Sequence, residues 1–476
     1  MDNKTRIISD EFTKLSIVGL VVVQLALANG LYLFLCYAVL FFLMYNLSQP
    51  YKPAIFTVVA INHMVQILPG IWLANYLDKD LNYRAIYTEK ATVLSLIGLL
   101  FLFAPLIYQQ NKIKRLSLKE FQTQANRLST NRTLNCYLIA LAITSVLTGV
   151  AFLYSGFTQI ILSVVKIKWF FFLLFGYLVF LKKEKKTVFY LLVAFEFISG
   201  FYSFFSEFKT VIYYLAVLLL GFVSNINFKQ LAIGAIGLFC MVFLGLMWTS
   251  VKNDYRAFLN KGEAKQSTSV SKDDALDKLL ELSSESQEKG TEGSTKVFLE
   301  RLQYTYHFAK ALERVPEVIP FQNGANWLEN IEFSTTPRFL NPNKPVIDNS
   351  AKTTKYTGIR YLGTKQGVSF SLGYFAEFYI DFGQYLMMFG ILFLGFVYAK
   401  LYKYFLTSSS DNPIFNYALV GAFFFEFANF EIDGTFLTGR LFASIVTFFA
   451  LTYFFGRPLL NYISVKNSDN KQQEGV

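Results

Sequence analysis

Apolar runs of membrane-spanning length recur along most of the chain, with short charged segments between them. The runs are apolar on every side instead of on one face, which suits lipid and not water. Hydrophobic residues make up 54% of the chain and charged residues 16%, against about 45–50% and about 25% in soluble domains. The sequence therefore predicts an all-α polytopic membrane protein.

About twelve of these runs are expected to be transmembrane helices. They are residues 15–28, 31–46, 55–77, 91–108, 133–154, 169–181, 188–204, 210–226, 230–250, 383–402, 413–430 and 438–456. The first two are short, because about 16 residues make roughly 24 Å of helix against a hydrocarbon core of ~30 Å. Ala28-Asn29-Gly30 is either a tight turn between them or part of one long tilted helix.

Basic residues set the expected orientation. Clusters lie in the short loops at 112–132 and 182–186, at Lys400 with Lys403, and at Arg457. With twelve spans all of them fall on one side, which the positive-inside rule identifies as the cytoplasm. Both termini are then cytoplasmic. Because topology explains much of the net charge of +11, that charge does not indicate a nucleic-acid partner.

This topology divides the chain into four parts. They are an N-terminal membrane domain (1–250), a large extracytoplasmic loop between spans 9 and 10 (251–382), a C-terminal membrane domain (383–456) and a cytoplasmic tail (457–476). The polar, low-complexity part at 260–296 is expected to be flexible. Residues 301–315 have helical spacing and end before Pro316. The Pro- and Asn-rich stretch after them has no regular period, which is typical of functional loops.

Cysteine and histidine usage indicates no metal or disulfide chemistry. Cys36, Cys136 and Cys240 all fall within apolar runs, so no disulfide framework is expected. His63 and His307 are the two histidines, which makes a histidine-based metal site improbable. No cofactor is expected.

Several cations lie near spans on the expected outer side, where the positive-inside rule predicts few. Snorkelling to the interface or solvation in a loop is the alternative for any single one. As a set they suit an anion site, because Arg forks and Lys point charges both bind phosphate oxygens. The residues are Lys209, Lys252, Arg256, Arg338, Lys344, Arg360, Lys365 and Arg440.

Carboxylates inside or beside the spans form a second set. An acid buried in a membrane is costly, so it indicates either function or a neighbouring cation as partner. One of them near the outer face is a candidate general base, and the sequence does not choose among them. They are Glu196, Glu207, Glu377, Asp381, Glu426, Glu431 and Asp433.

Four stretches carry a family resemblance. They are SGFYSFFSEFK (199–209), the pair Tyr255-Arg256, ERLQYTYHF with the following P-x-x-x-P-F-x-x-G and PRFLNPNKP, and SLGYFAEFYIDFG (371–383). In these the chain resembles the Wzy-type polymerases of oligosaccharide repeat units, relatives of the O-antigen ligases. The stretches lie within residues 199–395. In the rest of the chain, the layout of many helices with one large outer loop also resembles that of this family. Lys209 stands where many such relatives have Arg, which removes bidentate geometry there.

The resemblance implies a GT-C-like glycosyltransferase of the bacterial inner membrane. Donor and acceptor would both be oligosaccharides on polyprenyl diphosphate, and transfer would need no metal. Chain-length regulator and flippase proteins would be further partners. Arg338, Arg256, Glu377 and Glu426 are the expected catalytic residues. The expected substrate-binding residues are Lys209, Lys252, Tyr255, Lys344, Arg360 and Arg440.

Two other functions fit parts of the pattern. A lipid-glycan flippase or anion permease would explain twelve spans, but the chain shows no internal repeat of the kind common in transporters. An O-antigen-ligase-type transferase would share both layout and chemistry, and such relatives usually use a histidine of the outer loop. His307 lies on an apolar-periodic helix, where a packing role is favoured.

Overall fold

The computed structural model describes residues 11–151, 158–202, 208–223, 227–261, 270–288, 292–336, 341, 343–344, 348–361, 363, 369–407, 410–427 and 429–465. In these residues the regular structure is entirely helical. Eight of the described helical segments are long and apolar enough to cross a membrane. The chain is therefore a multi-pass membrane protein, as predicted.

The first half of the chain forms mostly apolar helices. They are α1 (Glu11–Leu25), α2 (Gly30–Leu47), α3 (Ile55–Val65), α4 (Leu68–Tyr76), η1 (Leu81–Tyr83), α5 (Thr88–Lys112), α6 (Leu118–Asn126), α7 (Thr130–Ala151), α8 (Thr158–Val165), α9 (Ile167–Lys182), α10 (Lys186–Ser199), α11 (Phe208–Leu220) and α12 (Phe228–Leu259).

Shorter, more polar helices form the segment predicted as the large loop. They are α13 (Lys272–Glu288), α14 (Glu292–Leu302), α15 (Thr305–Arg314), α16 (Ala325–Thr335) and α17 (Asn349–Thr357). The chain then returns to apolar helices with α18 (Tyr374–Thr407), α19 (Pro413–Phe424), α20 (Gly434–Ala450) and α21 (Gly456–Ile463).

Each predicted span overlaps one of the apolar helices. The eight of membrane length are Gly30–Leu47, Ile55–Tyr76, Thr88–Lys112, Thr130–Gly149, Thr158–Lys182, Gly234–Leu259, Tyr374–Thr407 and Gly434–Ile463. The shorter ones are α1, α10, Phe208–Leu220 and Pro413–Phe427. α1 and α2 are separate helices joined by a tight turn. A Cβ on Gly30 would lie 2.5 Å from the Leu25 carbonyl oxygen, so the turn requires glycine there.

Two predicted boundaries were wrong. The segment predicted at 169–181 begins at Thr158, where an outer loop was expected. α12 continues to Leu259, past the predicted end at 250. The predicted start at 383 coincides with a break inside α18, because Gly383 has a non-helical backbone (φ 69°, ψ −179°) that separates the residues before it from the span. Hydropathy marks only the apolar part of a helix, whereas backbone hydrogen bonding continues into water. Charged residues expected in loops therefore lie on helices.

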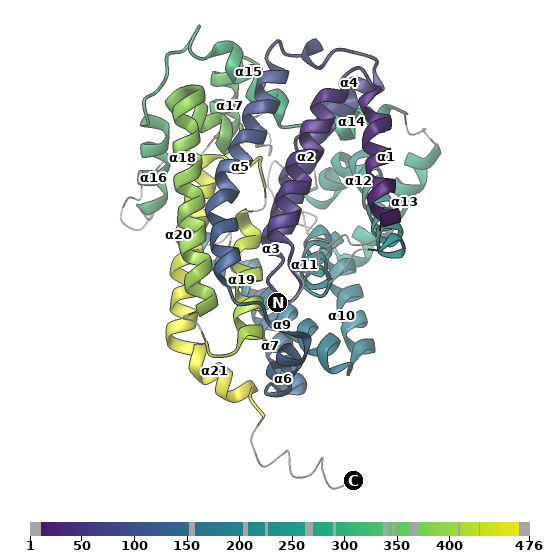
Figure 1. Ribbon diagram of the computed structural model, residues 1–476, viewed down its shortest axis with the longest axis vertical. Helices are drawn as coiled ribbons and strands as arrows, with labels where there is room; N and C mark the ends of the chain where they lie inside the picture. The colour runs from purple at the N-terminus through teal and green to yellow at the C-terminus, as the bar shows by residue number, and fades with distance from the viewer. Residues whose placement is uncertain are drawn as a thin grey trace.

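Segments predicted to share the cytoplasmic side meet at one end of the molecule. The Ser129 amide donates to the Ile463 carbonyl over 2.6 Å, and Lys182 Nζ donates to the Leu128 carbonyl over 2.6 Å. Asn412 Nδ2 donates to the Gln124 carbonyl over 3.2 Å. Figure 1 shows α6 and α21 at this end and α14, α15 and α17 at the other.

The segment predicted as the large loop packs onto the membrane helices. The helix expected over 301–315 is broken, because α14 ends at Leu302 and α15 begins at Thr305. At the break the Tyr304 amide donates to the Gln66 carbonyl over 2.9 Å. α15 ends before Pro316, as predicted. Within the stretch expected to be flexible, α13 packs on α12 through buried Ala275 and Leu282.

Candidate functional site

Five cations from four helices converge around the loop between α19 and α20. We call this set the cationic cluster: Lys209 on α11, Lys252 and Arg256 on α12, Arg301 on α14, and Arg440 on α20. Lys252 lies within electrostatic range of Lys209, Arg256 and Arg301. Charges of one sign repel at such range. Their convergence therefore marks a place built for negative charge.

Glu431 lies among these cations. Burial raises the pKa of its carboxyl group, while the positive charges of Lys209, Arg440, Lys252 and Arg301 oppose that rise. Lys209 and Arg301 are exposed, and the other three cations are partly exposed. The cluster can thus be reached by a ligand.

Helix geometry accounts for two members of the cluster. Lys252 and Arg256 are four residues apart on α12, so their side chains share one face. Tyr255, which was predicted to bind substrate, lies on the adjacent face and is fully buried. Its hydroxyl donates to the Phe201 carbonyl over 3.2 Å, and its ring packs on Trp248. Tyr255 therefore fixes the end of α12.

Glu426, a predicted catalytic residue, forms ion pairs beside the cluster. Its carboxylate pairs with Lys166 and lies 3.7 Å from Arg440 Nε. Glu426 thus orients Arg440 and balances Lys166.

Glu377, the other predicted catalytic acid, belongs to a buried polar network. Its side chain is fully buried, and Oε2 accepts from Lys352 Nζ and from Asn330 Nδ2, each over 2.8 Å. Within the described residues, Oε1 has no hydrogen-bond partner. A Cβ on Gly434 would lie 2.6 Å from Glu377 Oε2. Glycine at 434 therefore allows α20 to approach this carboxylate.

Asp433 joins the buried network to the loop that carries Glu431. It caps α20 by accepting from the Phe436 amide over 2.8 Å, and it also accepts from Asn349 Nδ2. Burial, followed by the charge of Glu377, raises the pKa of Asp433 to about 6. The loop thus places Glu431 among cations and Asp433 among buried carboxylates.

The remaining predicted residues lie elsewhere. Lys344 Nζ donates to the Phe333 carbonyl and, over 2.8 Å, to the Thr336 carbonyl, so its charge caps the C-terminus of α16. Arg360 is exposed. Arg338, Lys365 and Glu207 lie outside the described residues.

The other two predicted acids have structural partners. Glu196 pairs with Lys168 over 3.0 Å and accepts from the Tyr137 hydroxyl over 2.6 Å. Asp381 accepts from Asn326 Nδ2 over 2.7 Å and from the Trp327 amide over 2.9 Å. These contacts connect neighbouring helices and lie outside the cationic cluster.

Sequence reasoning missed two cations and the polar partners of Glu377. Lys166 was detectable by the rule that found Lys209, since it lies in the predicted outer segment 155–168. Arg301 was read as part of an ordinary loop helix. Lys352 and Asn330 approach Glu377 only through tertiary packing of α17 and α16 on α18, which leaves no signal in the sequence.

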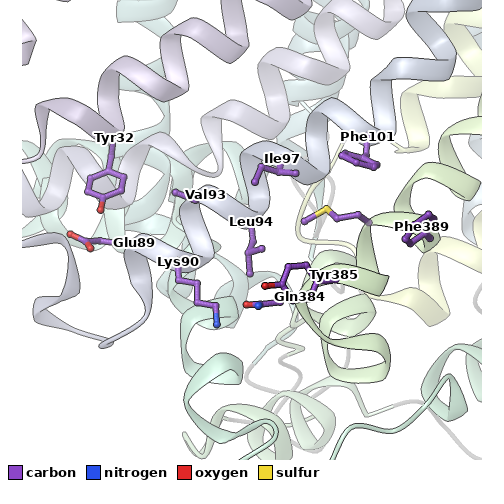
Figure 2. Close-up of a pocket in the computed structure, with 11 residues that line it drawn as sticks. Tyr32, Glu89, Lys90, Val93, Leu94, Ile97, Phe101, Gln384, Tyr385 and Phe389 are labelled. Atoms are coloured by element: carbon purple, nitrogen blue, oxygen red, sulfur yellow. The ribbon is translucent and has the colours of Figure 1, made fainter.

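A groove of about 700 Å³ lies between α2, α5 and α18. Figure 2 shows Val93, Ile97 and Phe101 following one another along α5, with Phe389 of α18 near the Phe101 end. Tyr32, Glu89 and Lys90 lie toward the opposite end of the row. The groove thus has a polar end and an apolar length. Among the described residues, no group of three or more His, Cys, Asp or Glu side chains could hold a metal ion.

Comparison with known proteins gives one family and no closer relative. A family model described as a domain of unknown function (DUF8712) matches residues 88–448. This match includes the cationic cluster, the buried network and most of the membrane helices. No curated protein matches the chain, and neither does any solved structure.

Proposed function

The chain belongs to the family described as a domain of unknown function (DUF8712), and we propose that it polymerises oligosaccharide repeat units linked to polyprenyl diphosphate. The observation that carries this proposal is the convergence of the cations of the cationic cluster, four of which lie near Glu431. A diphosphate leaving group develops charge as its bond to the sugar breaks. Preorganised Arg and Lys side chains stabilise such charge most effectively in a site shielded from water.

The transfer is a displacement at the anomeric carbon of the donor. The acceptor hydroxyl attacks that carbon, and a carbon–oxygen bond forms. The bond between the carbon and the diphosphate oxygen breaks, and the diphosphate lipid leaves with the bonding electrons. In this proposal Arg256, Lys252 and Arg301 hold the diphosphate, and Lys209 and Arg440 complete the cluster.

Glu431 is the base that the geometry favours. It lies within the cluster, and burial raises the pKa of its carboxyl group, which makes the carboxylate a better proton acceptor. Glu377 is fully buried and paired with Lys352, and Glu426 is paired with Lys166. We therefore assign proton acceptance to Glu431. Glu377 and Glu426, which were proposed from the sequence, hold the neighbouring side chains in position.

The same proposal includes a topology of about twelve spans in a GT-C-like arrangement. The meeting of four basic segments at one end supports a common cytoplasmic side. The segment 251–382 then faces the periplasm of a bacterial inner membrane, where lipid-linked units are joined. The groove of α2, α5 and α18 offers an apolar surface for a polyprenyl chain. Chain-length regulator and flippase proteins are the expected partners.

Chain growth in vitro tests the proposal. Purified protein in lipid nanodiscs is incubated with lipid-diphosphate repeat units from the producing cell, and the products are separated by gel electrophoresis. Wild-type protein is expected to give a glycan ladder, and Arg256→Ala and Glu431→Gln are expected to reduce it at least tenfold. Lys278→Ala is the matched control, since Lys278 pairs with Glu281 on α13 outside the cluster.

The products also separate the alternatives. Movement of intact lipid-linked units across the bilayer without chain growth would make the protein a transporter. Transfer of finished chains to a different acceptor would make it a ligase. Either result would overturn the polymerase assignment.

A further inference from the structure

A group of partly exposed aromatic and polar side chains lies on the segments outside the apolar helices. We call it the aromatic platform: Tyr83, Arg84, Tyr306, His307, Tyr361 and Phe370. Its members come from parts of the chain that are far apart in sequence, namely residues 83–84, helix α15, and the residues Tyr361 and Phe370.

Contacts hold the platform together as one surface. The Arg84 guanidinium lies 4.4 Å from the centre of the Tyr306 ring and pairs with Glu300 over 3.2 Å. His307 Nδ1 and the Tyr361 hydroxyl share a hydrogen bond of 2.8 Å. The Tyr361 and Phe370 rings pack with centroids 4.9 Å apart. Polar groups are thus fixed among the rings.

Exposure distinguishes this platform from the aromatic core. Tyr83 is 38% exposed and Phe370 is 37% exposed, and the Arg84 and Glu300 side chains are 28% and 30% exposed. Exposed rings on α5 or α18 face the lipid that surrounds membrane helices. The platform belongs to shorter, polar segments, so lipid contact does not explain its exposed rings.

The platform adjoins the cationic cluster. Glu300 pairs with Arg84 of the platform, and the next residue, Arg301, belongs to the cationic cluster. The Tyr304 ring lies 5.3 Å from the His307 ring, and its hydroxyl is within electrostatic range of Glu431 and Asp433. A molecule whose diphosphate sits in the cluster would therefore have its adjacent sugars next to the platform.

We propose that the aromatic platform binds the sugar rings of an oligosaccharide, which rests on the proposed function and names the glycan subsite beside its diphosphate. One face of a sugar ring carries C–H groups, and these pack against the electron-rich faces of Tyr and Phe. The hydroxyl rim of the sugar matches the Arg84–Glu300 pair and the His307–Tyr361 pair, which offer both donors and acceptors. A few fixed polar groups among aromatic rings are the usual composition of such sites.

An array of bacterial surface oligosaccharides tests the subsite with the full chain in nanodiscs. Wild-type protein is expected to bind at least one oligosaccharide of the array. Tyr306→Ala and Phe370→Ala are expected to weaken that binding at least tenfold. Tyr190→Ala is the matched control, since Tyr190 is a 57% exposed ring on α10. Size-exclusion chromatography and circular dichroism establish that each variant is folded.

Farnesyl diphosphate binding, measured on the same samples, separates the two proposals. The platform variants are expected to bind farnesyl diphosphate as the wild type does. Absence of binding to every oligosaccharide, or unchanged binding in both platform variants, would overturn the glycan subsite. Platform-dependent glycan binding without any farnesyl diphosphate binding would instead overturn the polymerase assignment and leave the subsite standing.

Discussion

Removing Lys352 should destabilise the fold by leaving Glu377 without its counter-charge. The Glu377 side chain is fully buried, and the Lys352 side chain is 21% exposed. In the Lys352→Met variant, Glu377 Oε2 would keep only the Asn330 donor. Its Oε1 already has no hydrogen-bond partner among the described residues. Methionine keeps most of the apolar stem of lysine, so the charge is the main loss.

The expected magnitude follows from the cost of an uncompensated buried charge. Breaking a buried ion pair by removing one partner costs about 3–5 kcal/mol. Because Lys352 retains some contact with water, we expect the lower end, about 3 kcal/mol, which is roughly a hundredfold in the unfolding equilibrium. Adding Glu377→Gln removes the stranded charge. The double variant should therefore regain about 2 kcal/mol.

Unfolding in SDS, followed by far-ultraviolet circular dichroism, measures this change. Wild type, Lys352→Met, Glu377→Gln and the double variant form a complete cycle. A Lys352→Met variant within about 0.5 kcal/mol of the wild type would refute the reasoning. So would a double variant no more stable than Lys352→Met.

Three further predictions concern neighbouring positions. Asp433→Asn should remove a pH dependence of the free energy of unfolding. The folded state raises the pKa of Asp433 from 3.8 to about 6, so its protonation stabilises the fold fully below pH 3.8, and this stabilisation is lost as the pH rises through about 6. Thermal unfolding of the wild type and the variant from pH 4 to 7 measures the difference. Lys344→Met should lower the stability by about 1 kcal/mol, because α16 loses its cap, and chain growth should be retained. Loss of chain growth at unchanged stability would instead show that Lys344 binds the diphosphate. Gly434→Ala should cost about 1–3 kcal/mol by overpacking, since its Cβ would lie 2.2 Å from Asn330 Nδ2; an unchanged melting temperature would contradict this.

The apolar helices could be predicted from the sequence because each one is a continuous run of apolar residues. Every predicted span overlaps a helix, and the separate α1 and α2 fit the turn at Gly30. Helix ends were less predictable. α12 carries Lys252 and Arg256 on a helix that continues past its apolar part, and hydropathy does not detect such an extension.

Part of the candidate site was predictable, because some of its cations lie on the expected outer side, where the positive-inside rule predicts few. Lys209, Lys252, Arg256 and Arg440 were selected as cations on the expected outer side, and the fold brings them together. The partners of Glu377 depend on how α16 and α17 pack, which no local pattern encodes. Lys344 was expected from the sequence to bind phosphate, because it is a cation flanked by prolines. In the structure its Nζ caps the C-terminus of α16.

The central claim is that the cationic cluster binds a diphosphate, and competitive binding tests it most directly. Affinities for farnesyl diphosphate and farnesyl monophosphate are measured on wild-type protein and on the Lys252→Ala/Arg256→Ala variant, in nanodiscs at fixed salt. Wild type should bind the diphosphate at least tenfold more tightly, and the variant should lose most of that preference. Equal affinity for both ligands in the wild type, or a preference unchanged in the variant, would contradict the account.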